Sequence, residues 1–426
     1  MIFLKQISDN FISSWRTHFA FRIYVFLVFA AALIQCFKGV LLVDSVEYIN
    51  AGKNMGEFRS WDCCYKGQLC DVFLHQTRRT PGYPFYLLLS GGGCFARLFQ
   101  IIPALLVPLL SLQLLSHFSN SRKAAQLLMW LFVFYPLQFY YTSLIMPEIW
   151  VQFFLLLLAL NLIQKKYAAG VVYATALAVF KPVFLPFLFL SALLFSLLAK
   201  WQKSVLLLPL CAYLFIGLVN KKQTGVFHFT SIATVNAWDY NARAVINRNV
   251  NSLQASQFMG YHDSIARTMR FDSGMKYLSQ QTQKVIFSNL ITYAFLHIRG
   301  CLITLIDPGR YDFIAWWQLP EGKGLMGIKG GHGLSAFFSQ PPLYLTYIFV
   351  FLFLSILKVL CALRGLFFNM QYQQVWILFV LFAIPLAMVG PVGSARYLMP
   401  VAPILFIFCA LGLKKANKTA HENSAH

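Results

Sequence analysis

Residues 23–43 read IYVFLVFAAALIQCFKGVLLV, and Lys38 is the only charged side chain in this run. A helix needs about 20 apolar residues to cross the hydrocarbon core of a bilayer. The run is longer than the apolar core of a signal peptide and lacks a small-residue cleavage site, so we interpret it as a retained membrane span. Further apolar segments follow near 93–117, 124–141, 148–164, 167–183, 184–199, 204–220, 343–363, 374–391 and 396–413.

The composition of the whole chain agrees with this interpretation. Hydrophobic residues make up 58% of the 426 residues and charged residues 12%, against about 25% charged in an ordinary soluble domain. We therefore predict an all-α polytopic membrane protein with about ten transmembrane helices. Segment 285–306 is also apolar, but His297 and Arg299 stand in its middle, where a charge is costly in lipid. We expect that segment to be an interfacial helix.

The net charge of +21 comes largely from lysines and arginines that flank the apolar segments. Short cytoplasmic loops are enriched in these residues, and no nucleic-acid-binding motif is present. The pattern predicts a multi-pass protein of the cell membrane (the inner or plasma membrane if the chain is bacterial). It predicts both termini in the cytoplasm, contact with membrane lipids and no nucleic acid partner. The predicted organisation is an N-terminal module of seven spans (1–220) with a helical external loop (44–92), an external segment (221–342), a three-span module (343–413) and a cytoplasmic tail (414–426).

Acidic residues are few, and their positions are therefore informative. Of fourteen in the chain, five lie in the first external loop, and Glu148 is the only one between Asp71 and Asp239. A carboxylate at a membrane boundary is a candidate for function. The alternative is that Pro147 and Glu148 open a helix, where a proline and an acid are both favourable.

Asp44 directly follows the first predicted span. In a helix that begins here, Asp44, Glu47, Tyr48 and Ala51 would share one face because of their spacing. The alternative is that Asp44 caps this helix, with Glu47 three residues later in an arrangement close to a capping box.

The first external loop ends in Arg78-Arg79-Thr80-Pro81-Gly82-Tyr83-Pro84. Two arginines before a proline-fixed turn can hold a phosphate at the membrane surface. They can equally be arginines that extend their charged ends from the bilayer into water.

Together these motifs resemble a known family. Asp44-x-x-x-Tyr48-x-x-Ala51, followed by Arg79-x-Pro81-Gly82-Tyr83-Pro84, is similar to the GT-C superfamily of membrane glycosyltransferases. The likeness is closest to the branch of the protein O-mannosyltransferases and the aminoarabinose transferases that act on lipid A.

Three later motifs resemble the same branch. They are Ser143-Leu144-Ile145-Met146-Pro147-Glu148, Phe180-Lys181-Pro182 and Arg396-Tyr397-Leu398-Met399-Pro400. The likeness covers most of spans one to six and the last span, whereas residues 205–342 have no counterpart. Many relatives carry an Asp-Glu pair where this chain has Asp44-Ser45, so a two-carboxylate role at that position is not implied.

The resemblance implies a donor sugar on a polyprenyl phosphate and an acceptor hydroxyl or amine on a lipid, glycan or protein at the non-cytoplasmic face. It implies that Asp44 is the catalytic base, and that Glu148 orients the acceptor or helps to hold a divalent metal, which some relatives use. The side chains implied to bind substrate or phosphate are Glu47, Tyr48, Arg79, Tyr83, Lys181, Arg396 and Tyr397.

Two other classes remain open. A flippase or other transporter of lipid-linked sugars predicts polar residues midway through the spans, whereas the predicted spans carry almost no central charge. A polysaccharide polymerase or ligase of a different membrane fold is the second alternative.

The cysteines fall into two groups. We interpret Cys36, Cys94, Cys211, Cys301, Cys361 and Cys409 as packing residues in or near apolar segments. In the external loop, a bridge from Cys70 to Cys63 or Cys64 is plausible on an oxidising side, and the spacing to His75 matches no standard zinc site. The glycine-rich stretch 322–333 is interpreted as a mobile loop over a site or as a plain linker.

Overall fold

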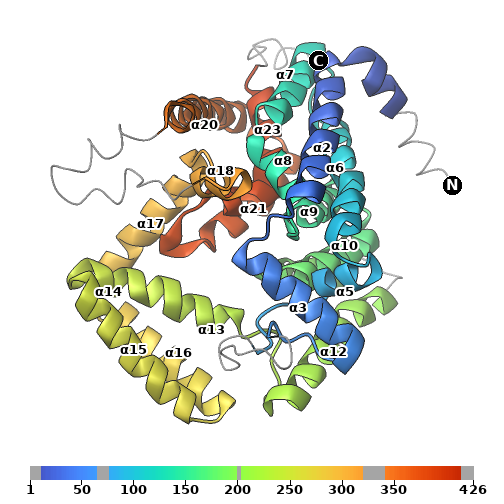
Figure 1. Cartoon of the computed structure of the whole chain (residues 1–426). Coiled ribbons are helices and arrows are strands. Elements are labelled where there is room, and N and C mark those ends of the chain that lie inside the picture. The colour runs from blue at the N-terminus through green and yellow to red at the C-terminus, as the bar shows by residue number, and fades with distance from the viewer. Residues whose placement is uncertain (1–10, 65–75, 199–202, 320–340, 414–426) are drawn as a thin grey trace.

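The computed structural model describes residues 11–64, 76–198, 203–319 and 341–413. Every regular element in these ranges is a helix (Figure 1). The predicted all-helical class is therefore confirmed. The glycine-rich stretch 322–333, Cys70 and His75 lie outside the described residues.

The N-terminal helices are α2 (Phe19–Lys38), α3 (Val43–Phe58), α5 (Gly82–Leu89), α6 (Gly93–Ser116), α7 (Arg122–Val133), α8 (Pro136–Ser143), α9 (Glu148–Ile163), α10 (Tyr167–Phe180), η1 (Pro182–Phe184), α11 (Leu185–Leu198), η2 (Lys203–Leu206) and α12 (Leu207–Thr224). The middle segment contains α13 (Ile232–Asn236), η3 (Ala237–Ala242), α14 (Arg243–Asn249), α15 (Ser252–Thr268), α16 (Phe271–Phe287), α17 (Leu290–Ile306) and α18 (Arg310–Trp317). The C-terminal helices are α20 (Pro342–Asn369), α21 (Gln373–Ala387), η5 (Gly390–Val392), α22 (Ala395–Leu398), η6 (Met399–Val401) and α23 (Ala402–Leu411).

Three of the described helices, α2, α6 and α20, are each long and apolar enough to cross a membrane. Two bent pairs would raise this number to five: α8 with α9, bent by 113°, and α16 with α17, bent by 96°. Large apolar side chains on α20, such as Phe353 and Phe367, are mostly exposed, as expected for a helix that faces lipid. The chain is thus compatible with a membrane protein.

Several predicted spans are shorter or more broken than the sequence suggested. The predicted span 124–141 is divided at Tyr135 into α7 and α8, because Pro136 cannot continue the hydrogen bonding of α7. Helix α10 has 14 residues, about 21 Å at the rise of an α-helix.

The first predicted span ends earlier than expected. Helix α2 stops at Lys38 because Gly39 adopts a left-handed conformation with φ of 67°, a common helix terminator. Residues 39–42 then link it to α3. Asp44 therefore lies in the first turn of a separate helix rather than at the end of the span.

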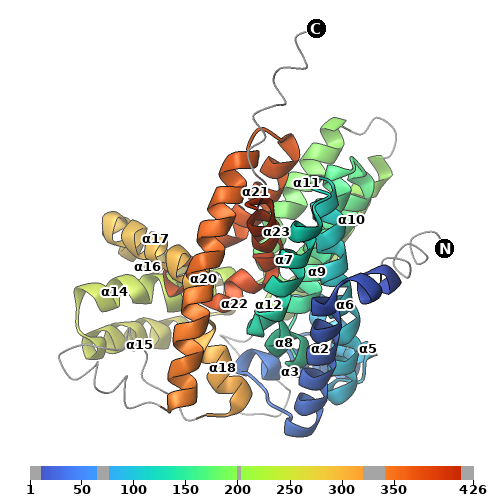
Figure 2. The same cartoon turned by 90° about the horizontal axis from the view of Figure 1, so that it is seen from above.

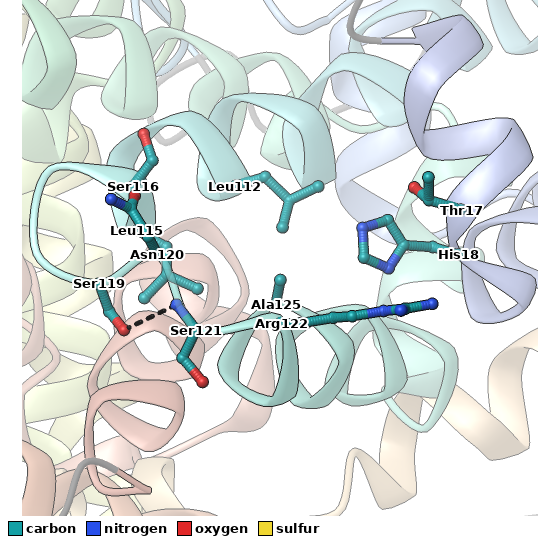
Figure 3. A pocket seen from close by; sticks show the side chains of 10 residues that line it. All are labelled: Thr17, His18, Leu112, Leu115, Ser116, Ser119, Asn120, Ser121, Arg122 and Ala125. Atoms are coloured by element: carbon teal, nitrogen blue, oxygen red, sulfur yellow. Dashed lines mark hydrogen bonds between the residues drawn. The ribbon is translucent and has the colours of Figure 1, made fainter.

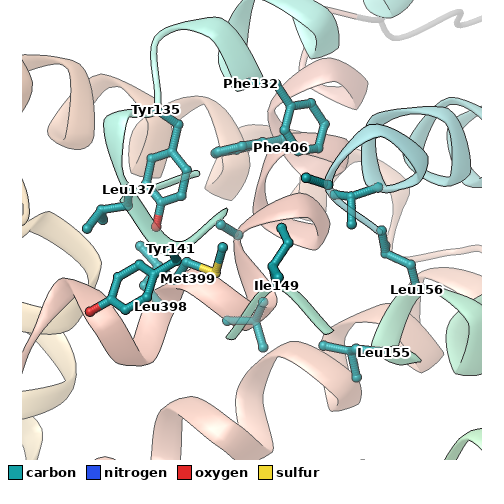
Figure 4. Close-up of a cluster of buried hydrophobic side chains, with 14 of the residues drawn as sticks. Phe132, Tyr135, Leu137, Tyr141, Ile149, Leu155, Leu156, Leu398, Met399 and Phe406 are labelled. Atoms are coloured by element: carbon teal, nitrogen blue, oxygen red, sulfur yellow. The ribbon is translucent and has the colours of Figure 1, made fainter. Parts of the chain in front are cut away.

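The core lies where α2, α6, α7, α9 and α23 pack together. Figure 4 shows Phe132 and Tyr135 on either side of Phe406, and their ring centroids lie 5.1 and 5.2 Å from that of Phe406. Ile149, which follows Glu148, and Met399, the first residue of η6, belong to the same buried cluster. The core thus anchors the beginning of α9 and the segment from α22 to η6.

Helices α14, α15 and α16 form a group apart from α2 and α6, as both views show (Figures 1 and 2). The group has its own apolar core, which includes Trp238, Met259 and Leu278. Helix α17 connects it to the rest of the protein.

Helix α17 exposes an apolar face that includes Ile291, Phe295 and Ile298. Its opposite face packs closely on η5, since a Cβ on Gly300 would lie 2.1 Å from the carbonyl oxygen of Gly390. One apolar face and one packed face suit the predicted interfacial helix.

One cysteine interpretation is wrong. Cys36, near the end of α2, and Cys94, at the start of α6, form a disulfide with Cα atoms 4.9 Å apart. Cys64 is also disulfide-bonded, whereas Cys63 is a free, buried thiol whose pKa is raised by burial to about 12.

Candidate functional site

The charged residues singled out in the sequence lie together in one network of ion pairs. The Arg79 guanidinium lies 2.6 Å from both Asp44 and Glu47, and the Arg396 guanidinium lies 2.6 Å from Asp44 and 2.8 Å from Glu148. The network is completed by Lys181, 3.0 Å from Glu148, and by Arg78, 3.1 Å from Glu47. We call these seven residues the ion-paired cluster. Three carboxylates and four cations leave it one net positive charge.

Helix α3 supplies two of the carboxylates from one face. Asp44 and Glu47 are three residues apart and meet the same guanidinium. The capping interpretation of Asp44 is wrong, because the helix begins one residue before it and the Leu42 N–H donates to Ser45 Oγ at 3.1 Å. Since Ser45 satisfies the helix end, the Asp44 carboxylate is available to the arginines.

The loop that carries Arg78 and Arg79 is held on several sides. Thr77 has a positive φ of 54°, its Oγ1 lies 2.7 Å from His228 Nε2, and Thr230 Oγ1 donates to the Arg78 carbonyl at 2.9 Å. These contacts come from residues far along the chain, so the segment after α12 fixes the arginine loop.

Gly82 connects this loop to Lys181. A Cβ on Gly82 would lie 2.7 Å from the Val179 carbonyl oxygen, so only glycine lets the start of α5 approach the end of α10 this closely. Lys181 follows α10 directly. The close approach therefore brings the two basic segments to one side of the molecule.

Glu148 lies at the centre of the other half of the cluster and is fully buried. Its Oε1 accepts hydrogen bonds from both Lys181 and Arg396, whereas its Oε2 has no hydrogen-bond partner among the described residues. Pro147 precedes α9 as expected. Asp307 Oδ2 accepts the Ala395 N–H at 2.9 Å and so fixes the turn that carries Arg396.

Two tyrosines of the predicted site, Tyr48 and Tyr83, pack against the buried side of the cluster. The Tyr48 and Tyr83 rings meet edge to face at 5.0 Å, and the Arg79 guanidinium lies 4.8 Å from the centre of the Tyr48 ring. Tyr83 donates to Gln100 Oε1 at 2.6 Å. Both rings are buried, so they position Arg79 in this arrangement, whereas Tyr397, next to Arg396, is only half-buried.

Asp44 and Arg396 are the most exposed members of the cluster, with side chains 20% and 23% exposed. Burial alone would raise the pKa of Asp44, but the Arg396 and Arg79 guanidiniums outweigh it and hold that pKa well below its usual range. Asp44 is therefore ionised and only weakly basic while both arginines contact it.

The arrangement suits an anion better than a metal. Each of the three carboxylates is already paired with a cation, and the described residues contain no group of three or more His, Cys, Asp and Glu side chains placed to hold a metal ion. A divalent metal would have to displace an arginine, so these residues do not fit one as they stand.

A pocket of 540 Å³ lies elsewhere, between the start of α2, the end of α6 and the start of α7 (Figure 3). Its lining includes His18, Leu112 and Arg122. The cluster begins beyond the opposite end of α2, so this pocket is no part of the site.

Two features of the site were missed from the sequence. Arg78 belongs to the cluster, although only its neighbour Arg79 was singled out as a site residue. Asp312 in α18 is buried and accepts a hydrogen bond from the Tyr141 hydroxyl of α8. Nothing local in the sequence could reveal this pair, because its members are 171 positions apart.

In comparisons with protein-family models, curated proteins and solved structures, nothing matched the chain. The sequence motifs and the geometry of the cluster are therefore the observations that bear on function.

Asp312 gives a prediction about pH and stability. Burial raises its pKa to about 7, against the lowering effect of the Tyr141 hydrogen bond. The folded protein then holds a proton that the unfolded chain, with a pKa of about 3.9, has released. Stability should fall as pH rises from about 4 to 7, by on the order of 1 kcal/mol per pH unit, and then level off.

Asp312→Asn keeps an acceptor for the Tyr141 hydroxyl but cannot ionise. We expect a higher melting temperature than the wild type at pH 8 and a smaller difference at pH 5, measured in detergent. Asp272→Asn, on α16 and with a side chain that is 41% exposed, serves as the control. The prediction is refuted if the difference in melting temperature between the wild type and Asp312→Asn is the same at pH 5 and at pH 8.

Proposed function

We propose that the protein is an integral-membrane glycosyltransferase of the GT-C type. It would move a sugar from a polyprenyl-phosphate donor to an acceptor hydroxyl or amine on the non-cytoplasmic face. The observation that carries the proposal is the ion-paired cluster, in which residues of every motif that resembles the family meet.

The charge of the cluster supports an anionic ligand. Arg79 and Arg396 hold Asp44 between them, and guanidinium groups bind phosphate oxygens in the same paired geometry as carboxylate oxygens. A donor phosphate that approaches Arg396 from its exposed side would therefore compete with Asp44 for both arginines.

This competition suggests how Asp44 could become the base. When a phosphate takes the two guanidiniums, the contacts that lower the pKa of Asp44 are lost, and burial then raises that pKa. Asp44 accepts the proton of the acceptor hydroxyl, whose oxygen forms a bond to the anomeric carbon. The bond from that carbon to the phosphate oxygen breaks, and the phosphate leaves with the electron pair and with inversion at carbon. Glu148 holds Arg396 and Lys181 in place.

The topology we propose has ten spans and two cytoplasmic termini, with bent or short helices such as α7–α8 and α21 completing the count. The Cys36–Cys94 disulfide supports an external position for the end of α2 and the start of α6, because disulfides persist on the oxidising side of a membrane.

Single cysteines report this topology. In a background without native cysteines, Ser256→Cys on α15 should react with a membrane-impermeant maleimide in intact cells. Lys123→Cys at the start of α7 should react only after the membrane is opened. Both positions are exposed, so accessibility does not bias the comparison. The reverse labelling pattern would overturn the scheme.

Phosphate binding can be measured without knowing the sugar. Arg79→Ala and Arg396→Ala should each weaken binding of polyprenyl monophosphate by about 1.5–3 kcal/mol, the range for a hydrogen bond to a charged group. Arg79→Lys and Arg396→Lys, which keep the charge, should bind at intermediate strength. The control Arg248→Ala alters an exposed arginine of α14. Equal affinity of the wild type for polyprenol without phosphate would contradict the proposal.

The role of Asp44 is tested by transfer of label from a radiolabelled extract of lipid-linked sugars to membrane acceptors. Asp44→Asn removes the proton-accepting carboxylate but keeps its size, and we expect a loss of about 10²–10⁴-fold in rate. Glu57→Gln, an exposed position on the same helix, should be close to normal. If Asp44→Asn transfers at the wild-type rate, the base lies elsewhere.

One observation favours a transporter. The predicted spans carry almost no central charge, and Lys358 is an exception: it is buried within α20, with its Nζ 4.7 Å from the centre of the Tyr135 ring. Charged groups inside a span are often functional. An assay of sugar transfer by the purified protein in detergent would distinguish an enzyme from a transporter or flippase, which makes no new covalent product. The size of the product would distinguish a transferase of single sugars from a polymerase or ligase.

A further inference from the structure

Helix α13 continues into α14 through η3, Ala237–Ala242, which is a single turn of π-helix. Such turns are rare and often occur at functional sites, because the extra residue redirects side chains. Here the redirected stretch contains Asp239 and Tyr240. Neither was singled out as a site residue from the sequence, since residues 205–342 match no motif of the resembled family.

The turn lies between the two arginine-bearing segments. On one side, Ser231, which directly precedes α13, donates to the Gln76 carbonyl at 2.8 Å beside the Arg78–Arg79 loop. On the other side Asn241 packs on η5, because a Cβ on Gly390 would lie 2.6 Å from Asn241 Oδ1. That second segment leads directly to Arg396. The turn is therefore fixed at both ends to the elements that carry the cluster.

The orientation of the turn is also fixed from within its own helical group. Trp238 is fully buried and donates from Nε1 to Asp263 Oδ1 at 2.7 Å. Because Trp238 is held inward, its neighbours Asp239 and Tyr240 point elsewhere. The Tyr240 side chain is 40% exposed and lies within electrostatic range of Tyr397.

Asp239 differs from the carboxylates of the cluster. Its ion pair with Arg243, on the same helix, is 3.9 Å long, and the Asp239 side chain is 26% exposed. Burial and the Asp263 carboxylate raise the pKa of Asp239, while Arg243 and Arg78 oppose the rise. Among the described residues, Asp239 thus has no ion pair shorter than 3.9 Å, and it lies within electrostatic range of the cluster arginine Arg78.

We infer that Asp239 and Tyr240 form a subsite that binds a sugar ring of the acceptor. A carboxylate oxygen pair accepts hydrogen bonds from two neighbouring hydroxyls, and such charge-assisted bonds are the stronger ones. An exposed aromatic ring offers its negative face to the C–H groups of a sugar. A carboxylate and an exposed ring on consecutive residues of one turn therefore match a carbohydrate.

The surrounding charge narrows the acceptor further. The charges of Arg78, Arg243 and Arg267 lower the pKa of Asp239, and the Asp263 carboxylate raises it. This excess of positive charge disfavours a protonated amine. We therefore expect a neutral hydroxyl acceptor rather than an amine. The carboxylate and the exposed ring match a hydroxyl on a free glycan or a glycolipid better than one on a peptide side chain. This inference rests on the proposed function for the identity of the reaction.

The test uses the full-length protein in detergent and needs no knowledge of the donor. Labelled protein is applied to an array of immobilised oligosaccharides and, in parallel, to an array of Ser/Thr-containing peptides. We expect binding to a subset of the oligosaccharides and none to the peptides. Asp239→Asn and Tyr240→Ala should each weaken the glycan signal by roughly tenfold or more, the loss expected for a charge-assisted contact.

Matched controls come from the same helical group. Asp272→Asn changes a carboxyl on α16 whose side chain is 41% exposed, and Tyr261→Ala changes an exposed tyrosine on α15. Both should bind glycans as the wild type does. All four variants should still bind polyprenyl monophosphate, which shows that they are folded. The inference is overturned if Asp239→Asn and Tyr240→Ala bind glycans as the wild type does. It is also overturned if the wild type binds the peptides instead of the oligosaccharides, or binds no glycan. If the wild type does not bind polyprenyl monophosphate, the proposed function is overturned instead.

Discussion

Arg396 holds the two halves of the cluster together. Its guanidinium contacts Asp44 at 2.6 Å and Glu148 at 2.8 Å, and thereby joins α3, α9 and α22. Glu148 is fully buried, and a buried charge that loses its partner is strongly destabilising. The positions of these three helix starts are therefore tied to one side chain. Asp307, which fixes the backbone next to Arg396, extends the same constraint to the end of α17.

This constraint accounts for the irregular helices. Three members of the network stand at a break beside an apolar segment. Asp44 follows the left-handed Gly39 and its linker, Glu148 directly follows Pro147, and Lys181 lies where α10 stops before Pro182. A straight helix through any of these points would carry its charge into lipid, which is costly. Short and bent helices place the charges at one end of the bundle and leave apolar faces elsewhere. That is why the described chain holds three to five helices or helix pairs that pass as spans by length and composition.

The sequence predicted the members of the network far better than the helices that carry them. Acids are so few that Asp44, Glu47 and Glu148 were conspicuous, and each lies at the edge of an apolar segment. Helix bends and the Cys36–Cys94 disulfide depend on which segments pack together, and apolar periodicity alone does not encode that. Asp312 was missed for a related reason, because its hydrogen bond joins it to the distant Tyr141. Lys358 is visible in the sequence as a charge within the predicted span 343–363, but only the structure shows that it is buried beside the Tyr135 ring.

The charge balance of the cluster also bears on how a ligand could enter. With four cations and three carboxylates, the ligand-free site is nearly neutral, so the cost of burying the arginines is mostly offset in advance. An arriving phosphate need not find an empty site. It can replace the Asp44 carboxylate at Arg79 and Arg396, which are already oriented for oxygen ligands. Asp44 and Arg396 are the most exposed members, so the pair that must open lies nearest to the surface. The buried pairs around Glu148 and Glu47 can then stay closed and keep the arginines in place during the exchange.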